Sequence, residues 1–166
     1  MARRLPNAGT SAAATWAHDW FPYEQYQVVH QSYMDRLRDE GLVARDSLSF
    51  YESEDAAGEL VLVVLRGRLV CSFDVLIRAD KKMLVMRDAH NRYMVRTRFY
   101  QYHAMVRGRA GQPRRDLSRI DNAHEGHLHR HLFDGAGAEL ETVELELDAM
   151  PTLDQFVRDA VSAASE

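Results

Sequence analysis

The sequence predicts an α+β fold: an antiparallel β-sheet meander of six to eight strands with an N-terminal and a C-terminal helix packed on it. Apolar residues recur every three to four positions near both ends, as in helices, and every second position between them, as in strands. Short turns containing Gly or Asp separate the alternating segments, which favours antiparallel neighbours. The chain has 166 residues, 46% of them apolar, enough for one domain with its own core.

The first residues differ from the rest, and we expect a flexible leader over 1–19 and a single α+β domain over 20–166. The leader contains Arg3 and Arg4 but no apolar run of the length found in a secretory signal. No stretch approaches the roughly 18 consecutive apolar residues of a membrane-spanning helix. We therefore expect a cytoplasmic protein without a membrane partner.

Helices are predicted at two places. The first spans residues 22–40, with a proline in its first turn, one apolar stripe, and Gly41 as a stop signal. The second follows Thr152, which forms a capping box with Gln155, and it ends near Ser165.

The segments between the helices alternate as strands do. Residues 60–65 form a nearly continuous apolar run, typical of a strand buried on both faces. We expect Gly67 at the turn of a hairpin and residues 80–82 at a second turn, and the longest strand over 93–107. No βαβ alternation or Gly-rich phosphate loop is present, which argues against the nucleotide-binding α/β classes. The single cysteine, Cys71, excludes a disulfide framework and a cysteine-based zinc finger.

Charge is unevenly distributed, although the net charge is only −4. Residues 81–120 contain 11 of the 21 basic residues and 2 of the 25 acidic ones, whereas residues 121–166 contain 2 basic and 11 acidic residues. The basic segment suits a partner that carries phosphate groups. The acidic segment either covers that surface or keeps the protein soluble. Alternatively, exposed strand faces simply alternate in charge.

Four of the eight histidines lie within residues 121–131. His127, His129 and His131 alternate along a predicted strand and share one face, with Arg130 on the other. Alternate residues of a strand lie about 7 Å apart, so two of these histidines can chelate one borderline metal ion. His124 or Asp121 would complete such a site.

Three interpretations of this cluster remain open. In the first, His129 and His131 act as general acid and base in RNA cleavage without a metal, assisted by a cation from a neighbouring strand. In the second, His127 and His129 bind zinc. In the third, the histidines form a polar ladder that only hydrogen-bonds to a partner.

The segment Asp-Asn-Ala-His at 121–124, followed by His127 and by His-Arg-His at 129–131, resembles the signature of TumE-type toxins of prokaryotic toxin–antitoxin systems. Residues 99–103 and 150–153 extend the resemblance, which covers roughly residues 60 to 160. It implies a small antiparallel β protein, paired with a cognate antitoxin, that acts on RNA or on the translation machinery.

We therefore expect a toxin-like component that acts on RNA or the ribosome through a histidine-rich strand and, if it is an enzyme, a metal-independent ribonuclease without a cofactor. The expected catalytic residues are Asp121, His124, His127, His129 and His131. The expected nucleic-acid-binding residues are Arg96, Arg98, Tyr100, Tyr102 and Arg130, with the tyrosines stacking on bases.

Two alternatives stand beside this expectation. One is a non-enzymatic module that binds nucleic acid or protein within a complex or an oligomer. The other is a metal-dependent hydrolase or zinc-binding protein.

Overall fold

The computed structural model describes residues 20–122, 127–146 and 149–166, and the expected leader over 1–19 lies outside these residues. A helix, a series of strands and a second helix follow one another along the chain, which confirms the predicted α+β class. The elements are β1 (Phe21–Pro22), α2 (Tyr23–Asp39), β2 (Val43–Asp46), β3 (Ser49–Glu54), β4 (Leu60–Cys71), the 3₁₀ turn η1 (Ser72–Asp74), β5 (Val75–Arg87), β6 (Tyr93–Val106), β7 (Arg115–Asp121), β8 (His129–Phe133), β9 (Glu139–Glu144) and α3 (Leu153–Ser165).

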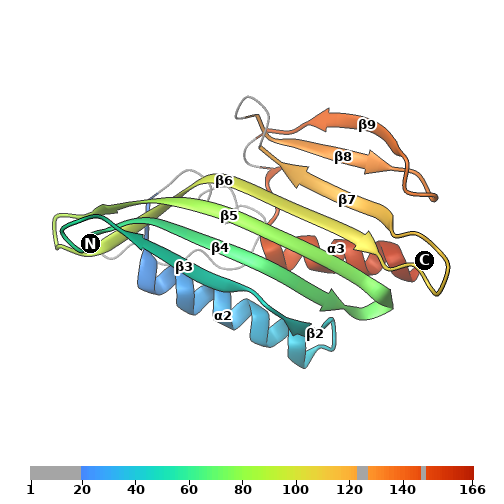
Figure 1. Cartoon of the computed structure of the whole chain (residues 1–166), viewed down its shortest axis with the longest axis horizontal. Coiled ribbons are helices and arrows are strands. Elements are labelled where there is room, and N and C mark those ends of the chain that lie inside the picture. Colours follow the sequence, from blue (N-terminus) through green and yellow to red (C-terminus); the bar gives the residue numbers. More distant parts are fainter. Residues whose placement is uncertain (1–19, 123–126, 147–148) are drawn as a thin grey trace.

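The strands form one antiparallel sheet, with nine strands among the described residues rather than the six to eight expected (Figure 1). Its order is β2-β4-β5-β6-β7-β8-β9, and β3 and β1 pair additionally with β4 and β6. β4, β5 and β6 are its longest strands and form its centre. From β4 to β9, neighbours in the sheet are also neighbours in sequence, as expected for a meander.

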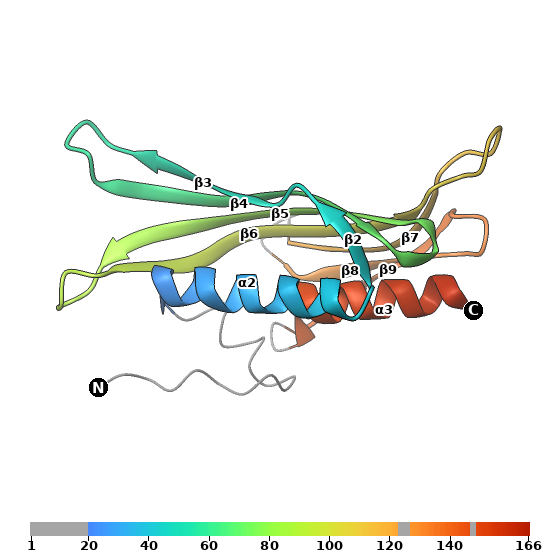
Figure 2. The same ribbon diagram turned by 90° about the horizontal axis from the view of Figure 1, so that it is seen from below.

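Both helices pack on the same face of the sheet (Figure 2). The buried positions of β5 that face them alternate, at Val75, Ile77 and Ala79. α3 begins where expected, because the Thr152 hydroxyl accepts a hydrogen bond from the Gln155 backbone N–H. The opposite face is not covered by either helix and is called the open face below.

Two turn predictions were wrong. Gly67 lies inside β4, opposite Ala79 of β5, and a Cβ at this position would lie 2.5 Å from the Ser47 carbonyl oxygen. Glycine is therefore needed where the segment between β2 and β3 crosses β4, and not for a hairpin turn. Residues 80–82 lie within the continuous strand β5. The chain instead reverses at η1, where Phe73 has a φ of 56°.

The acidic C-terminal segment does not cover the open face in the part of the chain that is described. β8 and β9 extend the sheet at one edge, while α3 packs on the helix-covered face (Figures 1 and 2). Among the described residues, neither helix has the length and apolar character needed to cross a membrane.

Candidate functional site

The open face carries two rows of polar residues that run across the strands. Directly paired residues of neighbouring strands share a face, so the strand register places them there. One row consists of Arg68, Arg78, His103, Arg119 and His131. The adjacent row consists of Arg66, Asp80, Gln101, Asp121 and His129. Both rows reach the histidines of β8, which the sequence singled out, and continue to Thr142 and Glu144 of β9.

Asp121, His129 and His131 converge into what we call the Asp–His centre. Asp121 is completely buried, and both histidines are only 8% exposed. Asp121 Oδ1 lies 3.1 Å from His129 Nε2, and Asp121 Oδ2 lies 3.5 Å from His131 Nε2. The two imidazole rings are 4.9 Å apart between centroids. The sequence therefore correctly placed these two histidines on one strand face, and the structure adds the carboxylate between them.

The other nitrogen of each imidazole is held by an acceptor. His129 Nδ1 lies 3.0 Å from the His127 carbonyl oxygen, and His131 Nδ1 lies 3.0 Å from Glu139 Oε1. A carbonyl or carboxylate oxygen only accepts, so each Nδ1 carries a hydrogen. The hydrogen bond from His131 lowers the pKa of Glu139, which therefore stays ionised at neutral pH.

A neutral imidazole that carries its hydrogen on Nδ1 has a lone pair on Nε2. In both histidines this lone pair would face the negatively charged Asp121 carboxylate, which is unfavourable unless a proton or a cation lies between them. Two species satisfy this arrangement: a proton on Nε2, which makes the ring an imidazolium, or a metal ion. His131 Nε2 is buried and has no hydrogen-bond partner among the described residues. One ligand atom from each of Asp121, His129 and His131 can be chosen within 4.8 Å of the others. Two histidines and one carboxylate are a donor set typical of zinc or iron(II).

Arg119 was missed by the sequence analysis and belongs to this centre. Its Nε donates to Asp121 Oδ2 at 2.7 Å, and its side chain remains 29% exposed. The guanidinium therefore compensates the buried carboxylate and also reaches the surface. A signal existed in the sequence, because Arg119 and Asp121 are alternate residues of one strand. In the same row, His103 Nε2 lies 2.6 Å from Asp116 Oδ1.

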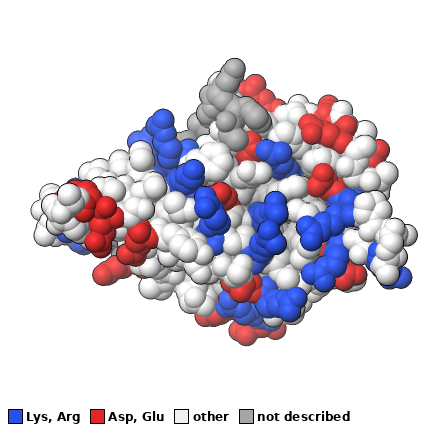
Figure 3. Space-filling model, viewed as in Figure 1, with Lys and Arg blue, Asp and Glu red and all other residues white. Residues whose placement is uncertain are grey.

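A basic surface adjoins the Asp–His centre on the open face. Figure 3, which views this face, shows Lys and Arg side chains across its middle and acidic side chains mainly at its periphery. Arg96 and Arg98 are exposed on β6, as expected for residues that contact phosphate groups. Other basic residues exposed on this face are Arg66, Arg68, Arg78 and Lys82.

The expectation that Tyr100 and Tyr102 stack on bases beside Arg96 and Arg98 is corrected. The tyrosines are 2% and 1% exposed and belong to the core under the helices. The register between β5 and β6 shifts between Lys82 and Met83, so that Arg98 is an extra residue in β6. Such a bulge reverses the side on which the following residues lie. The arginines therefore face outward and the tyrosines inward, although they have the same sequence parity.

Three further expected site residues lie outside the centre or cannot be placed. Arg130 pairs with Ile120, whose side chain is in the core, so Arg130 lies on the helix-covered side of β8. His127 is exposed and lies 3.4 Å from Glu144, and only its backbone carbonyl contacts His129. The group of described residues that could hold a metal ion is Asp121, His129 and His131, and it does not include His127. His124 lies outside the described residues.

Comparisons with protein-family models, with curated proteins and with solved structures find no match.

Proposed function

We propose that this protein binds RNA across the open face and cleaves it at the Asp–His centre, as the toxin-like component of a prokaryotic toxin–antitoxin pair. The observation that carries this proposal is the row in which Arg68, Arg78 and Arg119 lead to His131. Guanidinium groups pair with phosphate oxygens, so such a row suits a chain of phosphodiesters. The row supplies affinity, and the histidines of the Asp–His centre supply imidazole nitrogens that can accept or donate a proton.

The reaction assigned to the centre is transfer of the phosphodiester to the neighbouring 2′-hydroxyl. One imidazole of the pair takes the 2′-hydroxyl proton while the 2′-oxygen bonds to phosphorus. The other, as imidazolium, gives its proton to the departing 5′-oxygen, leaving a 2′,3′-cyclic phosphate and a 5′-hydroxyl. Arg119 stabilises the charge that develops on the phosphoryl oxygens. Asp121 holds both rings in position.

The cellular setting is part of the proposal: a cytoplasmic protein whose activity is restrained by its antitoxin. Induction of the chain without that partner arrests growth. The test compares the wild-type chain with the double variant His129→Gln, His131→Gln and with His127→Gln as the matched control. Arrest by the wild type and the control, but not by the double variant, supports the proposal. Arrest by all three at equal soluble levels contradicts it.

A second candidate function, metal-dependent hydrolysis, is favoured by the buried Nε2 of His131, which has no hydrogen-bond partner in the part of the chain that is described. Here a zinc or iron(II) ion would be held by Asp121, His129 and His131, with Glu139 and the His127 carbonyl orienting the rings. A bound metal supplies Lewis acidity and a more acidic water. The basic surface would still bind the phosphodiester.

Elemental analysis and zinc titration distinguish the two candidates. Stoichiometric metal in the purified chain, lost in Asp121→Asn and retained in Asp116→Asn, supports the metal-dependent reaction. RNA cleavage that continues in excess chelator, with no bound metal, supports the proton-transfer reaction and excludes the second candidate.

A further inference from the structure

A buried lysine lies on the other side of the sheet, away from the Asp–His centre. Lys81 of β5 is 8% exposed and occupies a position between the core residues Ala79 and Met83 on the helix-covered face. Its Nζ donates a hydrogen bond to the Tyr26 hydroxyl at 2.7 Å. It also lies 5.3 Å from the ring centroid of Tyr26 and 5.8 Å from that of Tyr102. These contacts orient the ammonium group but supply no full negative charge.

Within residues 20–122, 127–146 and 149–166, no carboxylate forms an ion pair with Lys81. Burial opposes the charge on this side chain, but the neighbouring Tyr102 and Tyr26 outweigh burial and hold the pKa of Lys81 above its usual range. The group is therefore a buried cation. Charges removed from water are normally compensated by a counter-charge, because an uncompensated one costs several kcal/mol.

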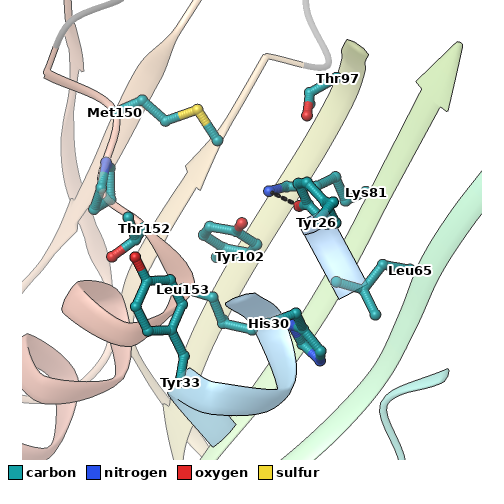
Figure 4. A pocket seen from close by; sticks show the side chains of 11 residues that line it. Tyr26, His30, Tyr33, Leu65, Lys81, Thr97, Tyr102, Met150, Thr152 and Leu153 are labelled. Carbon is teal, nitrogen blue, oxygen red and sulfur yellow. Dashed lines mark hydrogen bonds between the residues drawn. The ribbon is translucent and has the colours of Figure 1, made fainter. Parts of the chain in front are cut away.

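The Lys81 ammonium faces a cavity between the sheet and the two helices (Figure 4). The cavity has a volume of about 30 Å³, which is room for one or two water-sized groups. Hydroxyl-bearing side chains contribute to its wall, at Tyr26, Tyr33, Thr97, Tyr102 and Thr152. None of the described residues that line it is acidic. The cavity is thus small and polar, and the Lys81 ammonium supplies its positive charge.

Two further features make the cavity favourable for negative charge. Thr152 and Leu153 begin α3, and the N-terminal end of a helix carries a partial positive charge. His30 also lines the cavity, and burial, reinforced by the charge of Lys81, lowers its pKa to about 4. His30 is therefore neutral at pH 7, so that Lys81 is the charged side chain among the described lining residues.

We propose that this cavity binds a compact monovalent anion, either chloride or the carboxylate of a small acid such as formate, on the Lys81 ammonium. The neighbouring hydroxyl groups would donate to it, and the small volume favours a compact anion over a nucleotide. The site is separate from the open face and does not depend on the function proposed there. Its occupant compensates the buried charge and fastens α2 and the start of α3 to the sheet.

Thermal unfolding of the full chain tests this proposal in sodium chloride, sodium formate and sodium gluconate at equal ionic strength. Because a ligand of the folded state stabilises it by mass action, the bound anion raises the unfolding midpoint by several degrees when its concentration is about 100 times its Kd. The rise saturates with chloride or formate, and the salt that saturates at lower concentration identifies the preferred anion. Gluconate is too large to enter and serves as the reference.

Two variants locate the effect. Lys81→Met removes the charge at similar length and abolishes the anion-dependent rise, whereas Lys82→Met, a neighbouring exposed lysine on the open face, retains it. If Lys81→Met does not fold, chloride binding can be measured on the wild-type chain by broadening of the ³⁵Cl NMR signal. Formate that competes for the same site should reverse this broadening. Equal midpoints in all three salts together with no line broadening overturn the proposal, as does an unchanged rise in folded Lys81→Met.

Discussion

Asp121 of β7 lies between the paired histidines of β8, and its Oδ2 is 3.5 Å from the Nε2 of His131. The opposite nitrogen of this ring is bound to Glu139 of β9, so a chain of carboxylate, imidazole and carboxylate links three neighbouring strands. Antiparallel pairing creates this arrangement, because residues paired with or diagonal to one another on the same face come within side-chain reach. The register of strand pairing therefore creates the Asp–His centre, and each of its side chains is held in position by contacts with the others.

The buried carboxylate is expected to hold the centre together. Asp121→Asn removes the buried negative charge beside Arg119 and the two histidines, and we expect a loss of about 3 kcal/mol in the free energy of unfolding. Urea denaturation measures this loss. Asp116→Asn, which alters a half-exposed partner of His103 on the same face, should cost less than about 1 kcal/mol. Equal losses in the free energy of unfolding for the two substitutions would contradict this role of Asp121.

Binding of RNA should depend on the arginine row and on salt. Arg78→Ala removes an exposed guanidinium from the open face, so affinity for a single-stranded RNA should fall several-fold. The slope of log affinity against log salt should become shallower by roughly 0.7, the share of one phosphate contact on a single strand. Fluorescence anisotropy across a salt series measures both quantities. Arg36→Ala on α2 makes the same charge change on the other face, and it should leave both unchanged.

Acid should destabilise the protein in part through His30. Burial, with Lys81 and Arg38 assisting and Asp46 opposing, lowers the pKa of His30 to about 4, against about 6.5 in an unfolded chain. Between pH 4 and pH 6.5, His30 is protonated in the unfolded state and neutral in the folded state. The stabilising contribution is thus complete above pH 6.5 and decreases as the pH falls towards 4, by at most about 3 kcal/mol.

His30→Gln tests this dependence, because glutamine does not titrate. The difference in unfolding free energy between the wild type and this variant should change across pH 4–6.5 and be constant above it. A difference that is constant over the whole range would contradict the prediction.

The single thiol should be inert in the folded protein. Burial raises the pKa of Cys71 to about 12, so almost no thiolate exists at pH 8. Iodoacetamide should leave the native chain unmodified and label it stoichiometrically in urea, as mass spectrometry would show. Rapid labelling without denaturant would mean that the edge between β2 and β4 opens readily.

The sequence predicted the features that depend on residues close together in the chain. It did not predict the features that depend on which strand pairs with which. Thr152 and Gln155 mark the start of α3 because a capping bond spans only three residues. The shared face of His129 and His131 follows from strand alternation alone. By contrast, the extra residue at Arg98 turns Tyr100 and Tyr102 inward, and a bulge of this kind depends on the partner strand.

The same limit applies to Gly67 and Arg119. Glycine usually marks a turn, but Gly67 is needed because a distant backbone segment, at Ser47, passes against it. Arg119 and Asp121 are alternate residues of one strand, but the pairing of β7 with β8 is what places Arg119 opposite His131. Contacts between strands determine the roles of both residues. The register of strand pairing joins residues that are far apart in the chain, so it cannot be predicted from one sequence.

Cleavage of an end-labelled single-stranded RNA by the purified chain, with and without a chelator, tests whether the Asp–His centre is a ribonuclease site. The wild type and His127→Gln should produce fragments ending in a 2′,3′-cyclic phosphate, and His131→Gln should reduce the rate at least about 100-fold, the usual contribution of general acid–base catalysis. Intact RNA with the folded wild-type chain, or equal cleavage by His131→Gln, would contradict the account.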